Sequence, residues 1–320
     1  MSRIEDVIIP QTYEPYLRQG IIEKSNIYRS GLARQDAILN RRISEGGVLV
    51  QIPMWERLEG RSSHISRPGN ESPAGEITAI MDTGIKLMRE KKWTAENLAS
   101  ALAGDSAFDA IASMESDWWI EERQRFMIAV LRGVFDSPSV SATHVFDGGG
   151  GALNPAMTIR AKQLLGDNAD ILTMVIMNSL THSELQEQNL IETIPNARGE
   201  IEFQTYLGYR IIVDDTVPTT ETYLVAAGAL AHGEGTPVDQ IPVEVYRNSD
   251  ANSDYLVTRQ TFIMHIKGIS WTGNAFAPAT SNPTPEIEDL LNGENWNLVY
   301  PVKHVGVVKI THGEGLQDTP

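Results

Sequence analysis

The chain has 320 residues, of which 41% are hydrophobic and 21% charged, so it can bury a packed core and is not disordered as a whole. It contains no cysteine, which excludes a disulfide framework, a thiolate zinc site and a cysteine nucleophile. The formal net charge is −16, and the acidic excess is concentrated in residues 136–320, which carry 23 acidic and 9 basic side chains.

This charge distribution argues against specific binding of DNA or RNA, because nucleic-acid recognition uses a clustered basic face. The N-terminal residues Met1 to Pro10 have no apolar run typical of a signal peptide or an anchor. No stretch approaches the ~20 apolar residues that a membrane-spanning helix needs. We therefore expect a soluble protein that fits a reducing cytosol.

Residues 1–45 are expected to form an arm rather than a domain. Their apolar residues are scattered among Pro10, Pro15, Gly20 and Gly31, without a helical or strand period. Such a segment cannot bury its own apolar surface. Two alternatives stay open: the arm packs on its own domain, or it lies on another chain.

Residues 46–90 are expected to form a long two-stranded excursion. Val48–Trp55 is an apolar strand, and Glu76–Thr83 is its return strand. The segment between them, Glu59–Gly75, is polar and rich in turn-forming residues. A hairpin with so long a tip is marginal on its own and needs external support.

The longest predicted element is a helix from about Phe108 to Phe135. Its length would be roughly 42 Å, more than a compact domain usually needs, so we describe it as a spine. Its apolar stripe includes Trp118 and Trp119, and its opposite, polar face includes Arg123.

The rest of the chain is predicted to mix short helices and strands. A short helix is expected ahead of the spine, from Thr94 to Gly104. Beyond the spine, the pattern predicts helices at 154–165, 179–191 and 286–291, and strands at 171–177, 201–207, 210–213, 223–231, 243–246, 262–271 and 304–311.

Three kinds of motif suggest chemistry, and each has a simpler structural interpretation. The triplets His232–Glu234 and His312–Glu314 resemble metal ligands, but a central Gly suits a turn and further ligands are missing nearby. The segment Asp147–Gly151 lacks the ending of a phosphate-binding loop and is interpreted as a hinge. Asp214 and Asp215 point to opposite faces of a strand end. We therefore expect no catalytic residue, metal or cofactor.

The order of these parts resembles the Hong Kong 97-type major capsid fold of tailed bacteriophages. An arm, an extended hairpin, a spine helix, a mixed lobe and a returning strand follow one another over nearly the whole chain. The stretch Gly208–Asp215, with Pro218 after it, is similar to one that many of these coat proteins carry in the lobe. Val302–Ile310 is similar to their terminal strand.

The resemblance implies an α+β fold with four parts. Residues 1–45 would form the N-terminal arm and residues 46–90 the extended β-hairpin loop (E-loop). Residues 91–146 and 296–320 would form the peripheral domain, with the spine helix and the last strand. Residues 147–295 would form a mixed α/β axial domain.

The function that the resemblance implies is that of a major capsid protein, and not of an enzyme. The protein would self-assemble into hexamers and pentamers and form, by non-covalent contacts, an icosahedral head around phage double-stranded DNA. Its implied partners are copies of itself, a portal and a separate scaffold, while a decoration protein stays open and no membrane is involved. It would be made and assembled in the bacterial host cytoplasm and reside in the virion capsid.

Some relatives join a Lys in the extended loop to an Asn of a neighbour. Here Lys86 lies at the base of the loop and the tip carries arginines instead, so we predict no such bond. The arginines are hypothesised to meet the acidic surface of an adjacent lobe. The candidates for intersubunit contact are Trp55, Arg57, Arg61, Arg67, Trp118 and Trp119.

Two alternatives remain at the level of sequence. The first is an encapsulin-like compartment shell, which would enclose a cargo protein instead of DNA. The second is a soluble α/β hydrolase or metal-dependent enzyme that uses His232, His312 and Asp214. The enzyme alternative predicts a small oligomer with a pocket. The capsid and the compartment shell both predict particles of megadalton size.

Overall fold

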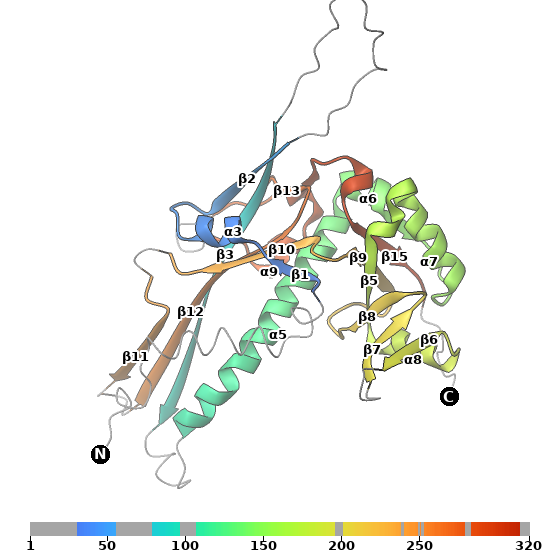
Figure 1. Ribbon diagram of the computed structural model, residues 1–320. Helices are drawn as coiled ribbons and strands as arrows, with labels where there is room; N and C mark the ends of the chain where they lie inside the picture. The colour runs from blue at the N-terminus through green and yellow to red at the C-terminus, as the bar shows by residue number, and fades with distance from the viewer. Residues whose placement is uncertain are drawn as a thin grey trace, which may run out of the picture.

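The structure is a computed structural model that describes residues 31–55, 79–96, 107–195, 201–237, 240–248, 250, 253–278 and 283–313. Within these residues one long helix, α5 (Ala107–Asp136), runs between two β-sheets (Figure 1). The helix confirms the predicted spine, and its 30 residues span about 45 Å. It ends where Ser137, which precedes Pro138, adopts an extended conformation (φ −64°, ψ 133°).

The first sheet contains the hairpin. Its strands are β1 (Ala33–Gln35), β2 (Leu49–Trp55), β3 (Ala79–Glu96), β10 (Leu230–Gly235), β11 (Val243–Asn248) and β12 (Ser253–Ile266). Over the described residues the order is β1-β10-β12-β3-β2, and β11 pairs with the N-terminal half of β12. The β3–β12 ladder ends at the pair Lys86–Ile263. Beyond it, among the described strands, β3 pairs with β2 alone, so the hairpin projects from the sheet (Figure 1).

The second sheet forms a separate lobe with short helices. Its order over the described residues is β4-β15-β9-β5-β8-β7-β6. The strands are β4 (Val145–Asp147), β5 (Leu172–Met177), β6 (Ile191–Pro195), β7 (Ile201–Tyr206), β8 (Tyr209–Val213), β9 (Glu221–Ala226) and β15 (Val307–Thr311). The helices are α6 (Pro138–His144), α7 (Pro155–Lys162) and α8 (Ser179–Glu187).

Smaller elements complete the described chain. Strands β13 (Ile269–Trp271) and β14 (Trp296–Leu298) pair with each other, and helix α9 (Ile287–Leu291) packs on the spine. Three 3₁₀ segments lie at Gln163–Ile171, Gly293–Asn295 and Val302–His304.

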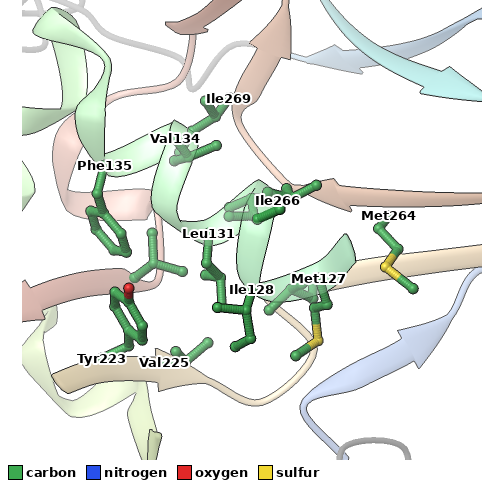
Figure 2. Packing of buried hydrophobic residues seen from close by; sticks show 14 of the residues in the cluster. Met127, Ile128, Leu131, Val134, Phe135, Tyr223, Val225, Met264, Ile266 and Ile269 are labelled. Atoms are coloured by element: carbon green, nitrogen blue, oxygen red, sulfur yellow. The ribbon is translucent and has the colours of Figure 1, made fainter. Parts of the chain in front are cut away.

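The main core lies around the C-terminal half of α5, from Phe126 to Phe135, which is buried on nearly all sides. On one side its residues contact Tyr223 and Val225 of the lobe, and on another they contact the end of β12 and β13 (Figure 2). The rings of Phe135 and Tyr223 stack with their centroids 5.5 Å apart. Both sheets therefore depend on the same stretch of helix.

The described part of the predicted arm, residues 31–45, contains a strand and a helix. β1 pairs in parallel with β10, and helix α3 (Ala37–Ile43) lies on the first sheet. Leu39 and Ile43 are buried against Val50 and Ile263. Residues 31–45 therefore pack on their own subunit, while residues 1–30 lie outside the described residues.

Three predicted elements are wrong, because long-range pairing overrides the local pattern. Thr94 is the partner of Tyr255 in the β3–β12 ladder and does not begin a helix; residues 97–106 lie outside the described residues. The predicted strand 223–231 turns at Gly228 (φ 71°) and divides between the two sheets. The predicted strand 262–271 turns at Gly268 (φ 92°) and becomes β12 and β13.

The two sheets combine segments that the sequence assigned to different domains. Residues 230–266, assigned to the axial domain, supply β10, β11 and β12 of the sheet that contains the hairpin strands. The last strand, β15, was assigned to the peripheral domain, but it pairs with β9 and β4 in the lobe sheet. The turn at Gly228 is the physical reason for the first difference, because it carries the chain from one sheet to the other.

A substitution at Gly133 tests how closely α5 and α9 approach each other. A Cβ atom at Gly133 would lie 1.8 Å from the carbonyl oxygen of Leu290, which is backbone and cannot rotate away. We expect Gly133→Ala to lower the free energy of unfolding by about 1–3 kcal/mol, measured by urea unfolding. The control is Gly46→Ala, where no atom lies within 4 Å of the added methyl group. Equal stability of the two variants would contradict this packing.

Candidate assembly surfaces

The hairpin presents an apolar face that the described residues do not cover. The register pairs Pro53 with Met81 and Trp55 with Ala79, so these four side chains share one face. Leu49 lies on the same face, separated from them by the polar pair Gln51 and Thr83. Leu49 is 56% exposed, Trp55 70% and Met81 46%. We call these five residues the hairpin strip. Single exposed apolar residues are common on soluble proteins, but a contiguous patch of them indicates an interaction surface.

The opposite face of the hairpin is used inside the subunit. Val50 is buried against α3, and Ile52 packs at the edge of the same cluster. From Pro53 to Trp55 the alternation of the strand thus leaves one face exposed, whereas at the base of the hairpin Ile85, the partner of Leu49, is buried in the main core. Trp55, a predicted contact residue, lies on the exposed face.

A second surface lies beside the N-terminal half of α5. The indole of Trp118 contacts those of Trp93 and Trp119, with ring centroids 5.8 and 4.9 Å away. The Lys91 Nζ lies 4.8 Å from the centroids of both Trp93 and Trp118, which is a cation–π geometry. Met114, one turn before Trp118, is 66% exposed. We call Lys91, Trp93, Met114 and Trp118 the spine cluster.

The structure separates the two adjacent tryptophans that the sequence grouped together. Trp118 is half-buried and keeps an exposed edge. Trp119 is fully buried, and its indole N–H donates to the Thr258 hydroxyl at 3.2 Å. In this conformation Trp119 has no surface left for a neighbour. Arg57, Arg61 and Arg67 lie outside the described residues, so their predicted contacts stay predictions.

Lys86 lies at the base of the hairpin and points into the subunit. Its Nζ donates to the carbonyl oxygens of Ile43 (3.1 Å), the last residue of α3, and of Glu45 (2.6 Å), just beyond it. Burial lowers the pKa of Lys86, and the charge of Glu45 opposes this shift. The amine therefore caps a helix C-terminus, a favourable place for a cation.

A buried ion pair connects the spine to the first sheet, where the sequence predicted a polar, solvated face. The Arg123 guanidinium donates to Glu234 at 2.8 Å and to Gln260 at 2.7 and 3.0 Å. Both charged side chains are buried. Breaking such a pair leaves an unpaired charge in the interior, so these partners hold the register between α5, β10 and β12.

Histidines 232 and 312 are structural in this arrangement. Burial lowers the pKa of His232 well below its ordinary value, and the nearby charge of Arg123 adds to the shift. Burial also lowers the pKa of His312, whose ring bonds the Thr222 hydroxyl at 2.9 Å. His232 lies in the first sheet and His312 follows β15 in the second, so the predicted hydrolase set is not brought together.

The other candidate motifs also have local structural partners. One carboxylate oxygen of Asp214 accepts from the backbone N–H and the hydroxyl of Thr216, as a turn-forming residue does. Asp215 accepts from the N–H of Ser179 at the start of α8. Among the described residues, no three His, Asp or Glu side chains are grouped so that they could hold a metal ion. No helix in the same part of the chain is long and apolar enough to cross a membrane.

Comparison with solved structures identifies the fold. The chain is similar to the capsid of Ralstonia phage GP4, with a TM-score of 0.59 and 10% identity over 90% of this chain and 88% of that one. It is also similar to the capsid of cyanophage Pam1, with a TM-score of 0.53 and 12% identity over 89% of each chain. The architecture is therefore an α+β capsid fold.

Comparison of sequences gives the family. The chain is 32% identical over 324 residues to the major capsid protein of Bacillus phage SPP1. The aligned region covers 97% of this chain and 98% of that protein. No protein-family model matches the chain. The protein belongs to the phage major capsid proteins, as the resemblance noted in the sequence implied.

The buried histidines make stability depend on pH. His232 is held neutral in the folded state, whereas in the unfolded chain it takes up a proton near pH 6.5. The contribution of His232 to the free energy of unfolding is therefore fully present above pH 6.5. It is lost as the pH falls below 6.5, at up to about 1.4 kcal/mol per pH unit. We expect the unfolding free energy to fall between pH 7.5 and 5.5.

The matched variant for this prediction is His232→Gln, which removes the titrating group and keeps a polar side chain. Urea unfolding at each pH should give a shallower slope for the variant. His144 and His312, whose pKa values burial also lowers, leave a residual slope in the same direction. Identical slopes for variant and wild type would exclude His232 as a source of the effect.

Proposed function

We propose that this major capsid protein assembles into hexamers and pentamers that form an icosahedral phage head around double-stranded DNA. The observation that carries the proposal is the hairpin strip, an exposed apolar surface on an element that projects from the subunit (Figure 1). The family to which the chain belongs supplies the kind of partner, namely further copies of the same chain. The comparison favours this function over the compartment shell and over the hydrolase.

The strip is suited to burial against a neighbouring subunit. A pair of strands has little stability by itself in water, and its apolar face adds stability only when that face is buried. Burial of apolar surface contributes about 25 cal/mol per Å², so covering Trp55 and Met81 stabilises both the hairpin and the contact. Symmetry repeats each contact around the shell, so individually weak contacts are sufficient.

The spine cluster is proposed as a second contact. Lys91 between two indole rings gives it a positive charge, while residues 136–320 of each copy carry a large acidic excess. An acidic surface of a neighbour therefore complements the cluster. The same argument supports the proposed contacts of Arg57, Arg61 and Arg67.

The remaining proposals follow from the family rather than from the geometry. The subunit is proposed to assemble in the cytoplasm of a bacterial host, with a portal and a separate scaffold as partners. The contacts of the shell are proposed to be non-covalent. The orientation of Lys86 supports this last point, because its Nζ already donates to two carbonyl groups inside the subunit.

Electron microscopy of the purified protein tests the function directly. We expect closed particles of megadalton mass, and particles isolated from infected cells should contain double-stranded DNA. A small oligomer under all conditions of assembly would refute the proposal. Particles that contain a cargo protein and no DNA would favour the compartment shell instead.

The hairpin strip makes a prediction of its own. Trp55→Asp places a charge in the proposed contact, so we expect assembled particles to decrease at least about tenfold, as for a centrally placed contact residue. Because Trp55 is exposed, the unfolding free energy of the free subunit should change by less than about 0.5 kcal/mol. Trp55→Phe, which keeps an apolar ring, is the control and should assemble. Normal assembly of Trp55→Asp would remove the strip from the interface.

A further inference from the structure

The direction of the hairpin is not determined by a continuous sheet. The β3–β12 ladder stops at Lys86, and among the described strands the segment from Ala79 to Ile85 pairs only with β2, which itself pairs only with β3. Two strands joined only to each other can pivot at their base. Contacts outside the ladder must therefore hold them relative to the spine, and the packing of Val50 on α3 is one of these.

The carboxylate of Asp82, in the middle of the unsupported segment, makes a second contact, which is polar and directional. It accepts hydrogen bonds from the His265 Nε2 at 2.8 Å, the Gly268 N–H at 2.9 Å and the Ser270 hydroxyl at 2.9 Å. The Ser270 Oγ in turn accepts from the N–H of Thr83 at 3.1 Å. Asp82 and His265 are both completely buried.

The three donors come from three consecutive parts of one corner of the fold. His265 lies at the end of β12, Gly268 in the turn and Ser270 in β13. The corner belongs to the main core, since Ile266 and Ile269, which flank the turn, pack on the spine (Figure 2). Burial alone would raise the pKa of Asp82, but the bonds from His265, Gly268 and Ser270 outweigh it and lower the pKa.

We propose that Asp82 is a positioning residue that fixes the direction in which the hairpin leaves the subunit, and so determines the size of the assembled shell. Hydrogen bonds to a buried carboxylate are short and directional. A tilt of the hairpin that moved the Asp82 carboxylate by a few ångströms would therefore break at least one of the three bonds. This inference rests on the proposed function, because the hairpin strip has to reach a neighbour at a defined angle.

The test compares Asp82→Asn and Ser270→Ala with a matched control. The Asn variant keeps the shape of the side chain but turns an amide N–H toward groups that are themselves donors. The Ala variant removes one of the three donors. The control is Leu165→Ala, which creates a cavity in the fully buried core of the lobe, away from the hairpin.

The first measurement is hydrogen exchange in the free subunit, which needs no shell. We expect the amides of Thr83 and Gly268 to exchange about tenfold faster in Asp82→Asn than in wild type, the factor that one lost buried hydrogen bond corresponds to. Ser270→Ala removes the acceptor of the Thr83 N–H, so Thr83 should exchange faster in it as well, while Gly268 should show a smaller increase than in Asp82→Asn. Leu165→Ala should change neither amide. Unchanged exchange in Asp82→Asn would overturn the proposal. If that variant does not fold, unchanged exchange at Gly268 in Ser270→Ala would overturn it equally, because Gly268 donates to Asp82 and not to Ser270.

The second measurement is the distribution of shell diameters by electron microscopy, at a temperature well below the midpoint of unfolding of each variant. We expect the fraction of shells with the wild-type diameter to fall about tenfold in Asp82→Asn and less in Ser270→Ala. Leu165→Ala should keep the wild-type diameter despite its lower stability. Wild-type diameters in both Asp82→Asn and Ser270→Ala, or an equal change in the control, would overturn the positioning role. Failure of the wild type to form shells would contradict the proposed function and leave the exchange measurement to decide on Asp82.

Discussion

The structure depends on the burial of one half of one helix. From Phe126 to Phe135 the spine packs against both sheets, so almost every side of it must be apolar, which is unusual for a helix in a subunit of this size. Ordering the two sheets costs conformational entropy, and the apolar contacts with the spine offset this cost. We therefore expect the two parts to unfold together, even though their strands are drawn from different regions of the chain.

The elements that the sequence predicted best are those with a strong local pattern. The spine and the first hairpin strand were recognised because their apolar patterns are strong. The return strand, predicted at Glu76–Thr83, was recognised only at its start, because β3 continues to Glu96 through a polar stretch. The turns at Gly228 and Gly268 were missed because apolar residues continue on both sides of each turn, and only the pairing of distant strands shows where the chain changes sheet. Arg123 was assigned to the polar face because its partners, Glu234 and Gln260, lie more than a hundred residues away.

The candidate surfaces were predicted in part. Trp55 was recognisable as an apolar residue at the end of a strand, but its neighbours in the strip became apparent only from the register of β2 and β3. Trp118 and Trp119 are adjacent, yet successive helical residues point about 100° apart, and only one of them reaches the surface. Asp82 offered one signal that went unused, namely a carboxylate among the apolar residues of a strand. Its three donors could not be inferred without the corner that presents them.

Strand β2 has a consequence for how copies of the subunit can join. Within the described residues it lies at the border of its sheet and pairs with β3 alone. An open border of this kind is a template on which identical chains add strand to strand, and such growth has no natural end. Pro53 lies in the middle of β2 and has no N–H to donate, so backbone pairing along this border would be interrupted. Association is thereby left to side chains on the faces, where the angle between copies is set and growth can close on itself instead of continuing as a fibre.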